Sequence, residues 1–133
     1  GRGLVLVKKE DSVVLGINKE ISPLIESIRK DEITKDLSKA SLETLSIIIY
    51  KQNITRSEID YIRGVNSSFI LRNLLIRGLV EKFIDSKDSR RVLYRPTIEL
   101  YAYMGITQTT ELPNYEKVSN ELQEILNQKE NND

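Results

Sequence analysis

The sequence contains no cysteine and no histidine, which removes several kinds of chemistry. Without cysteine there can be no disulfide and no thiolate metal site, and a metal ion would have to be held by oxygen ligands alone. The proton shuttles and nucleophile–base pairs of many enzymes also depend on these two side chains. We therefore expect a non-enzymatic protein without catalytic residues, cofactor-binding residues or metal ligands.

Long apolar runs are also missing. No stretch approaches the ~20 residues of a membrane-spanning helix, and nothing resembles a secretory leader. We therefore expect a cytoplasmic protein with no membrane partner. The absence of cysteine is compatible with the reducing cytoplasm. The sole methionine is Met104, so we also expect the sequence to be part of a longer chain.

The formal net charge is zero, but the charges are unevenly distributed over the 133 residues. Residues 37–96 carry eleven basic and six acidic side chains, whereas residues 97–133 carry two basic and seven acidic side chains. A mildly basic middle beside an acidic end favours a protein partner at least as well as nucleic acid.

The segment 37–80 has the most regular pattern and predicts three short helices followed by a strand. Ser38 is placed to cap the first helix. Thr55 and Glu58 have the spacing of a capping box at the start of the second helix, and Gly64 is placed to end that helix in a left-handed conformation. We expect one core made by Leu45, Ile49, Ile59, Ile62, Leu71, Leu74, Leu75 and Leu79.

A hairpin follows the three helices. Residues 66–68 offer an N-cap for the third helix, and residues 79–84 and 92–94 predict two strands joined by the polar tip 85–91. Helix, turn, helix, turn, helix and hairpin is the order of a winged helix. The predicted fold class is therefore mainly α (α+β), with a winged helix-turn-helix domain.

Two further helices are expected after the wing. Thr97 is placed to cap a helix over residues 98–104, and Gly105 is placed to end it. Asn114 can cap a last helix, which is amphipathic because its apolar residues recur on one face. This C-terminal stripe consists of Tyr115, Val118, Leu122, Ile125 and Leu126.

The run LETLSIIIYKQNITRSEIDYIRGVNSS, residues 42–68, resembles the second winged-helix domain of the bacterial segregation and condensation protein B (ScpB) family. The resemblance is close over residues 37–113 and looser over residues 3–28. A generic winged helix would share the spacing of the apolar residues, but not the sequence motifs YKQ at 50–52 and RGV at 63–65. The family usually has Gly-Arg-Pro at the wing tip, where this chain has Ser-Arg-Arg at 89–91.

The resemblance implies a role and partners. It implies an adaptor in chromosome condensation, chromosome segregation and cell division that binds the kleisin ScpA and, through it, SMC, at the nucleoid. It also implies a homodimer, because the family dimerises through its first winged-helix domain. The alternative function is that of a DNA-binding module or transcription regulator, and direct DNA binding is less favoured.

The resemblance also suggests how the chain is divided. We expect residues 1–30 to be a hairpin and helix, the remnant of a first winged-helix domain, and residues 31–36 to be a charged linker. Residues 37–106 would form the winged-helix domain, and residues 107–133 the C-terminal helix with a polar tail.

The outward face of the third helix is the first candidate partner site. At 100° per residue this face carries Phe69, Arg72, Asn73 and Ile76. Arg72 and Asn73 could read bases in a major groove, whereas two large apolar side chains favour a protein contact. Burial by the C-terminal stripe or by the N-terminal hairpin is the alternative. Phe69 departs from the small residue that is usual in the family.

Two further surfaces are candidates. Leu122 and Ile125 of the C-terminal stripe are predicted partner contacts, with packing on their own domain as the alternative. Residues 1–30 carry many apolar side chains, which either the same chain or a second chain would cover. The family's dimerisation favours the second chain, with dimer contacts at Leu4, Leu6, Val13 and Leu15.

Overall fold

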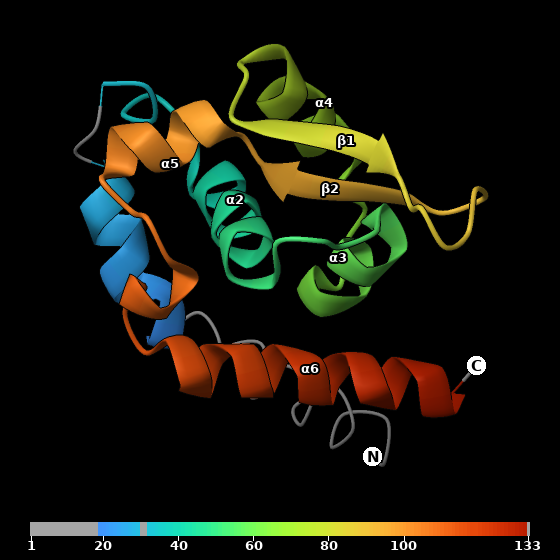
Figure 1. Cartoon of the computed structure of the whole chain (residues 1–133). Coiled ribbons are helices and arrows are strands. Elements are labelled where there is room, and N and C mark those ends of the chain that lie inside the picture. Colours follow the sequence, from blue (N-terminus) through green and yellow to red (C-terminus); the bar gives the residue numbers. More distant parts are fainter. Residues whose placement is uncertain (1–18, 30–31, 133) are drawn as a thin grey trace.

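The computed structural model describes residues 19–29 and 32–132, and the predicted hairpin lies outside this part of the chain (Figure 1). The fold is mainly helical with a small antiparallel sheet, as predicted. Residues 19–29 form a first helix. The elements that follow are α2 (Lys39–Lys51), α3 (Arg56–Arg63), α4 (Ser68–Ile76), β1 (Val80–Ile84), β2 (Val92–Pro96), α5 (Ile98–Met104), the 3₁₀ helix η1 (Thr109–Glu111) and α6 (Tyr115–Asn132).

Helix α2 lies at the centre of the molecule and contacts α3, α4, α6 and β2. Figure 1 shows α6 running along one side, below α2 and α3, with α4 and the two strands on the opposite side. The 19–29 helix and α5 flank α2 at the end where α6 begins. The three central helices therefore have α6 against one face and the wing against another.

Local capping signals set the helix ends as predicted. The Ser38 side chain accepts a hydrogen bond from the backbone N–H of Ser41, and Thr55 and Glu58 form both hydrogen bonds of the capping box. Gly64 ends α3 with φ +73°, a conformation that glycine adopts without a steric cost. Thr97 caps α5 in the same manner as Ser38 caps α2.

The wing is a two-stranded antiparallel hairpin, in which Val80 pairs with Pro96 and Ile84 with Val92. The second strand is longer than predicted, because it continues to Pro96. A bridge between Ile54 and Tyr94 extends the sheet, with hydrogen bonds of 3.1 Å and 2.7 Å between their backbones. Since Ile54 precedes α3, this bridge fixes the wing to the turn between α2 and α3.

The predicted core is formed, with one exception. Leu75 is half-buried and packs against the core from its edge, while the other seven predicted core residues are buried in it. Helix α6 and the 19–29 helix add further side chains to the same cluster. The described residues thus share one hydrophobic core, although the chain was divided in the prediction into a remnant and a separate winged helix.

The 19–29 helix packs on the same chain. Its apolar face is buried in the common core, and Glu20 pairs with Lys117 of α6 at 2.9 Å. The apolar side chains in the described part of residues 1–30 are therefore covered by the same chain rather than by a second copy. The buried residues of this helix are Ile21, Leu24, Ile25 and Ile28.

The segment predicted as a linker is also packed. Thr34 is fully buried and its hydroxyl donates to the carbonyl of Ile28. The backbone N–H of Leu37 donates to the carbonyl of Thr34 at 3.0 Å, and Asp36 pairs with Arg77 at 2.5 Å. Residues 32–36 therefore connect the first helix to α2 and α4 through specific contacts.

Candidate partner-binding surface

Helix α4 is held in place by polar contacts from α3 and from the turn between them. The Asp60 carboxylate accepts a hydrogen bond from the Ser67 backbone N–H at 2.8 Å, and the Asn66 side chain accepts one from the Ser68 N–H at 2.9 Å. Arg63 donates to the Ser67 hydroxyl at 3.0 Å. Within the predicted capping segment 66–68, Ser67 occupies the N-cap position, but its own side chain makes no capping hydrogen bond. The first turn of α4 is thus fixed by its neighbours.

The outward face of α4 lies where the sequence predicts it. Phe69 and Ile76 expose 84% and 76% of their surface, and Arg72 between them is exposed too. Asn73 is half-buried at the margin of the face. We call these four residues the α4 outward face. The opposite face packs inward through Leu71 and Leu74.

The C-terminal stripe, unlike the α4 outward face, is buried within the chain. Leu122 and Ile125 are buried in the core of the same chain, and α6 contacts α2 and α3. They are therefore not accessible to a partner, and the structure supports the alternative that the stripe packs on its own domain. Helix α6 does not cover Phe69 and Ile76. The predicted dimer contacts Leu4, Leu6, Val13 and Leu15 lie outside the described residues.

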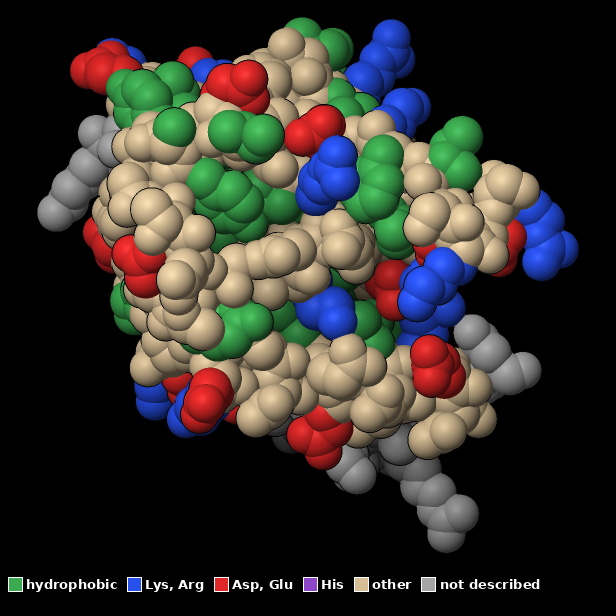
Figure 2. Space-filling view, viewed as in Figure 1, with side chains coloured by type: hydrophobic (Ala, Val, Ile, Leu, Met, Phe, Trp, Pro, Cys, Tyr) green, Lys and Arg blue, Asp and Glu red, His purple; other side chains and the backbone are tan. Residues whose placement is uncertain are grey.

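Most arginines of the winged helix are paired with acidic side chains. Arg91 bridges the wing to the capping box, with its guanidinium 3.4 Å from Glu58 and 3.4 Å from Asp85. Arg95 pairs with Glu81 and lies 4.0 Å from the centroid of the Phe83 ring. Figure 2 shows acidic and basic side chains interspersed over the face in view, without one continuous basic area.

Two pairs of carboxylates that lie close in sequence, Glu58 with Asp60 and Asp85 with Asp88, bind backbone N–H groups. Glu58 belongs to the capping box, and Asp60 anchors α4 through Ser67. Asp85 and Asp88 accept hydrogen bonds from backbone N–H groups within the wing tip. Among residues 19–29 and 32–132, no group of three or more acidic side chains could hold a metal ion. The same part of the chain has no helix that is long and apolar enough to cross a membrane.

Shifted pKa values occur at contacts that hold elements together. Burial raises the pKa of Tyr50 to about 12, and its hydroxyl donates to the carbonyl of Pro113 just before α6. The hydrogen bond from Arg77 lowers the pKa of Asp36. The hydrogen bond to Glu20 raises the pKa of Lys117. These shifts arise from packing and ion pairs between elements.

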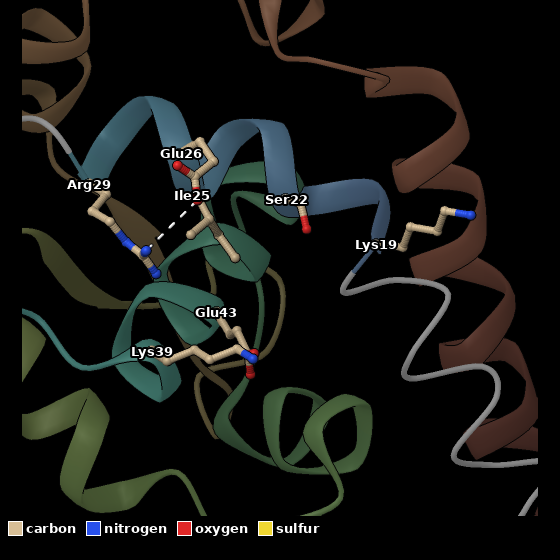
Figure 3. A pocket seen from close by; sticks show the side chains of 7 residues that line it. All are labelled: Lys19, Ser22, Ile25, Glu26, Arg29, Lys39 and Glu43. Carbon is tan, nitrogen blue, oxygen red and sulfur yellow. Dashed lines mark ion pairs between the residues drawn. The ribbon is translucent and has the colours of Figure 1, made fainter.

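A shallow groove of about 360 Å³ lies between the 19–29 helix and the start of α2 (Figure 3). Its charged side chains are of both signs, and Glu26 and Arg29 form an ion pair across one turn at 3.8 Å. This mixed lining does not select a ligand of one charge. The lining residues are Lys19, Ser22, Ile25, Glu26, Arg29, Lys39 and Glu43.

A family model described as "Segregation and condensation complex subunit ScpB" matches residues 1–115. The chain belongs to the ScpB family. The protein of this name from Clostridium tetani is 38% identical over 125 residues, which are 92% of this chain and 66% of the relative. That from Streptococcus equi subsp. equi is 42% identical over 124 residues, 92% of this chain and 69% of the relative. The chain thus spans about two thirds of the length of these ScpB relatives.

Solved structures show a similar arrangement. ScpB from Mycobacterium tuberculosis is 32% identical with a TM-score of 0.49, over 65% of this chain and 54% of that one. FabT from Streptococcus pneumoniae, solved in complex with DNA, is 20% identical with a TM-score of 0.50, over 77% of this chain and 68% of that one. The likeness to FabT concerns the winged-helix fold alone.

Proposed function

We propose that this chain acts in chromosome condensation and segregation as a non-enzymatic adaptor that binds the kleisin ScpA and, through it, SMC. The observation that carries the proposal is membership of the ScpB family over residues 1–115. The names of the relatives indicate the process, segregation and condensation. The description of the family as a complex subunit indicates that the protein works in an assembly. The protein would work near the nucleoid by holding a flexible kleisin segment in a fixed geometry.

The chemistry of the described residues supports an adaptor. The carboxylates of the two close pairs in the winged helix are used for capping, anchoring and turn formation; they are Glu58, Asp60, Asp85 and Asp88. One helix, α4, places two large apolar side chains on the same outward face and leaves them exposed, at Phe69 and Ile76. A binding role needs such a surface, whereas hydrolytic or transfer chemistry needs activated polar groups.

DNA binding is the weaker alternative. In a helix-turn-helix protein the N-terminal residues of the recognition helix contact base edges. Here Phe69 occupies the first turn of α4, and it has no hydrogen-bonding group with which to read a base. Arg56, Arg77 and Arg91 are engaged by Asp60, Asp36 and Glu58 respectively. A phosphate contact at these sites would compete with an existing ion pair.

Direct binding to the kleisin tests the proposal. The chain and the central fragment of ScpA from the same organism are mixed and followed by calorimetry. We expect a complex with a Kd of about 1 µM or below. If no complex forms while circular dichroism shows an intact fold, the adaptor function is wrong. In parallel, duplex DNA is titrated at low salt, where a phosphate-contacting module would bind and lose affinity steeply as salt rises.

We also propose a homodimer built by the hairpin residues Leu4, Leu6, Val13 and Leu15. The family model includes this segment, and symmetric dimers are the commonest assemblies of identical chains. Light scattering of the whole chain over a range of concentrations tests it. We expect dimers that Leu6→Asp and Leu15→Asp disrupt, whereas Phe69→Asp on α4 leaves them intact. A monomer at every concentration would contradict this proposal.

A further inference from the structure

We infer that the α4 outward face is the docking site for an acidic amphipathic helix of the kleisin. The inference rests on the proposed function and names the surface and the chemistry of the contact. The face has two properties that select such an occupant: apolar side chains at a helical spacing, and positive charge around them.

The apolar spacing fits a helix. Phe69 and Ile76 are seven residues apart on α4, so they are separated by about 10.5 Å along its axis. Another helix that lies along α4 presents apolar residues at the same spacing, at i, i+3 or i+4, and i+7. Both side chains are more than three-quarters exposed and stand on an element whose backbone is fixed by Asp60 and Asn66. They therefore form rigid anchors that need little ordering on binding.

The charge around these anchors is positive. Arg72 lies between them and makes no ion pair within residues 19–29 and 32–132. Arg56 donates to the Ser68 hydroxyl at 3.1 Å and Arg63 to the Ser67 hydroxyl, so both guanidinium groups lie beside the first turn of α4. Asp60, 3.8 Å from Arg56, is the acid paired with them. Three arginines and one aspartate leave a positive surface that complements an acidic partner.

The charge is uneven along α4, which gives the contact a direction. At the C-terminal end, Arg77 is neutralised by Asp36 at 2.5 Å. Since Arg56 is paired with Asp60, the uncompensated positive charge lies on Arg63 and Arg72, at the N-terminal half of α4. A docked helix gains most when its acidic residues lie over this half and its apolar residues reach Ile76.

Matched variants of the whole chain test the inference in calorimetry with the central ScpA fragment. Phe69→Ala removes an anchor, and Ile98→Ala removes an equally exposed side chain from α5 (78%) as its control. Arg72→Glu reverses the charge of the face, and Arg90→Glu is its control at an exposed arginine of the wing tip, which pairs with Asp88. We expect Phe69→Ala and Arg72→Glu to weaken binding about tenfold or more. The two controls should stay within about twofold of the unsubstituted chain.

Salt dependence separates the charge from the apolar contact. Raising salt from about 50 mM to about 300 mM should shrink the effect of Arg72→Glu, because exposed charges are screened. The effect of Phe69→Ala should remain, because apolar burial is not screened.

The possible results are distinguishable. If the fragment binds equally to all four variants, the inference is overturned and the adaptor function stands. If the unsubstituted chain does not bind the fragment, both are overturned. If Arg72→Glu abolishes binding to duplex DNA and leaves the fragment unaffected, the face belongs to nucleic acid. If Phe69→Ala dissolves self-association in light scattering without changing the fragment's affinity, a second copy occupies the face.

Discussion

Helices α4 and α6 both carry apolar side chains on more than one turn, but the chain covers them differently. The stripe of α6 is buried against α2 and α3, including Leu122 and Ile125. Helix α4 buries Leu71 and Leu74 on one side and leaves Phe69 and Ile76 in solvent on the other. The comparison shows that an apolar stripe found in a sequence does not indicate whether the same chain covers it.

The energetic consequence is that the two helices should respond differently to truncation. Side chains covered by the chain contribute to its stability, whereas exposed side chains contribute little to it. Four measurements test this contrast, from the largest expected effect to the smallest.

Leu122→Ala should reduce the free energy of unfolding by about 2–5 kcal/mol, because it leaves a cavity between α6 and the central helices. Leu74→Ala should have an effect in the same range for the same reason on the inner side of α4. Urea denaturation followed by circular dichroism provides the measurement. Asn120→Ala, at an exposed position of α6, is the control and should change stability little. A loss below about 0.5 kcal/mol for Leu122→Ala would mean that α6 does not pack as described.

The Tyr50 hydroxyl, which holds the chain just before α6, should make stability depend on pH at the alkaline end. Its pKa in the folded state, about 12, lies above the ordinary value of 10.0, so the folded state keeps a proton that the unfolded state loses. This contribution is fully present below about pH 10 and is lost as pH rises toward 12. Relative to Tyr50→Phe, the unsubstituted chain should therefore lose about 2–3 kcal/mol between pH 9 and pH 12.

Subtracting the pH dependence of Tyr50→Phe stability from that of the unsubstituted chain cancels the contribution of all other titratable groups. Tyr61→Phe, at an exposed position of α3, is the control and should follow the unsubstituted chain. Parallel curves for the unsubstituted chain and Tyr50→Phe across this range would show that Tyr50 is not buried against Pro113.

Thr55→Ala removes the cap of α3, the helix that lies between α4 and α6. It should cost about 1 kcal/mol, because the N–H of Glu58 loses its acceptor. Ser57→Ala in the same turn is the control, since Ser57 is exposed. Equal stability of the two variants in thermal or urea unfolding would remove the capping box from the account of this fold.

Phe69→Ala should change the free energy of unfolding by less than about 0.5 kcal/mol, because a solvent-exposed side chain makes few contacts within the folded chain. This is the measurement that decides the contrast with Leu122. A loss comparable to that of Leu122→Ala would show that Phe69 is covered within the chain, and it would remove the α4 outward face as a binding surface.

The parts of the fold that depend on near neighbours in sequence could be predicted. The cap at Ser38, the capping box at Thr55 and the left-handed Gly64 each involve residues within one helical turn. The apolar spacing of α4 likewise placed Phe69 and Ile76 outside. The sequence spacing of such patterns determines their geometry, because the interacting groups are three or four residues apart.

The parts that depend on distant residues could not be predicted. The bridge between Ile54 and Tyr94 is a single backbone pair and leaves no pattern in the sequence. The charged segment 31–36 was predicted to be a linker, but its packing could not be predicted: Thr34 is buried and Asp36 pairs with Arg77, which is 41 residues away. Residues 66–68 were expected to offer the N-cap of α4. The Asn66 side chain accepts from the Ser68 N–H, but the acceptor for the Ser67 N–H is Asp60 of α3, which the local pattern does not reveal. Periodicity likewise identified the stripe of α6 but not its partner.

The bridge at Ile54 has a consequence for how the sheet meets other molecules. With Ile54 on one side and β1 on the other, β2 has neighbours along both edges, so among the described strands a long free edge remains on β1 alone. That edge carries Glu81 and Lys82, and exposed charges of this kind discourage a foreign strand from pairing. The wing is thereby protected against joining sheets with another chain, although its outermost pair, Ile84 and Val92, is apolar and exposed.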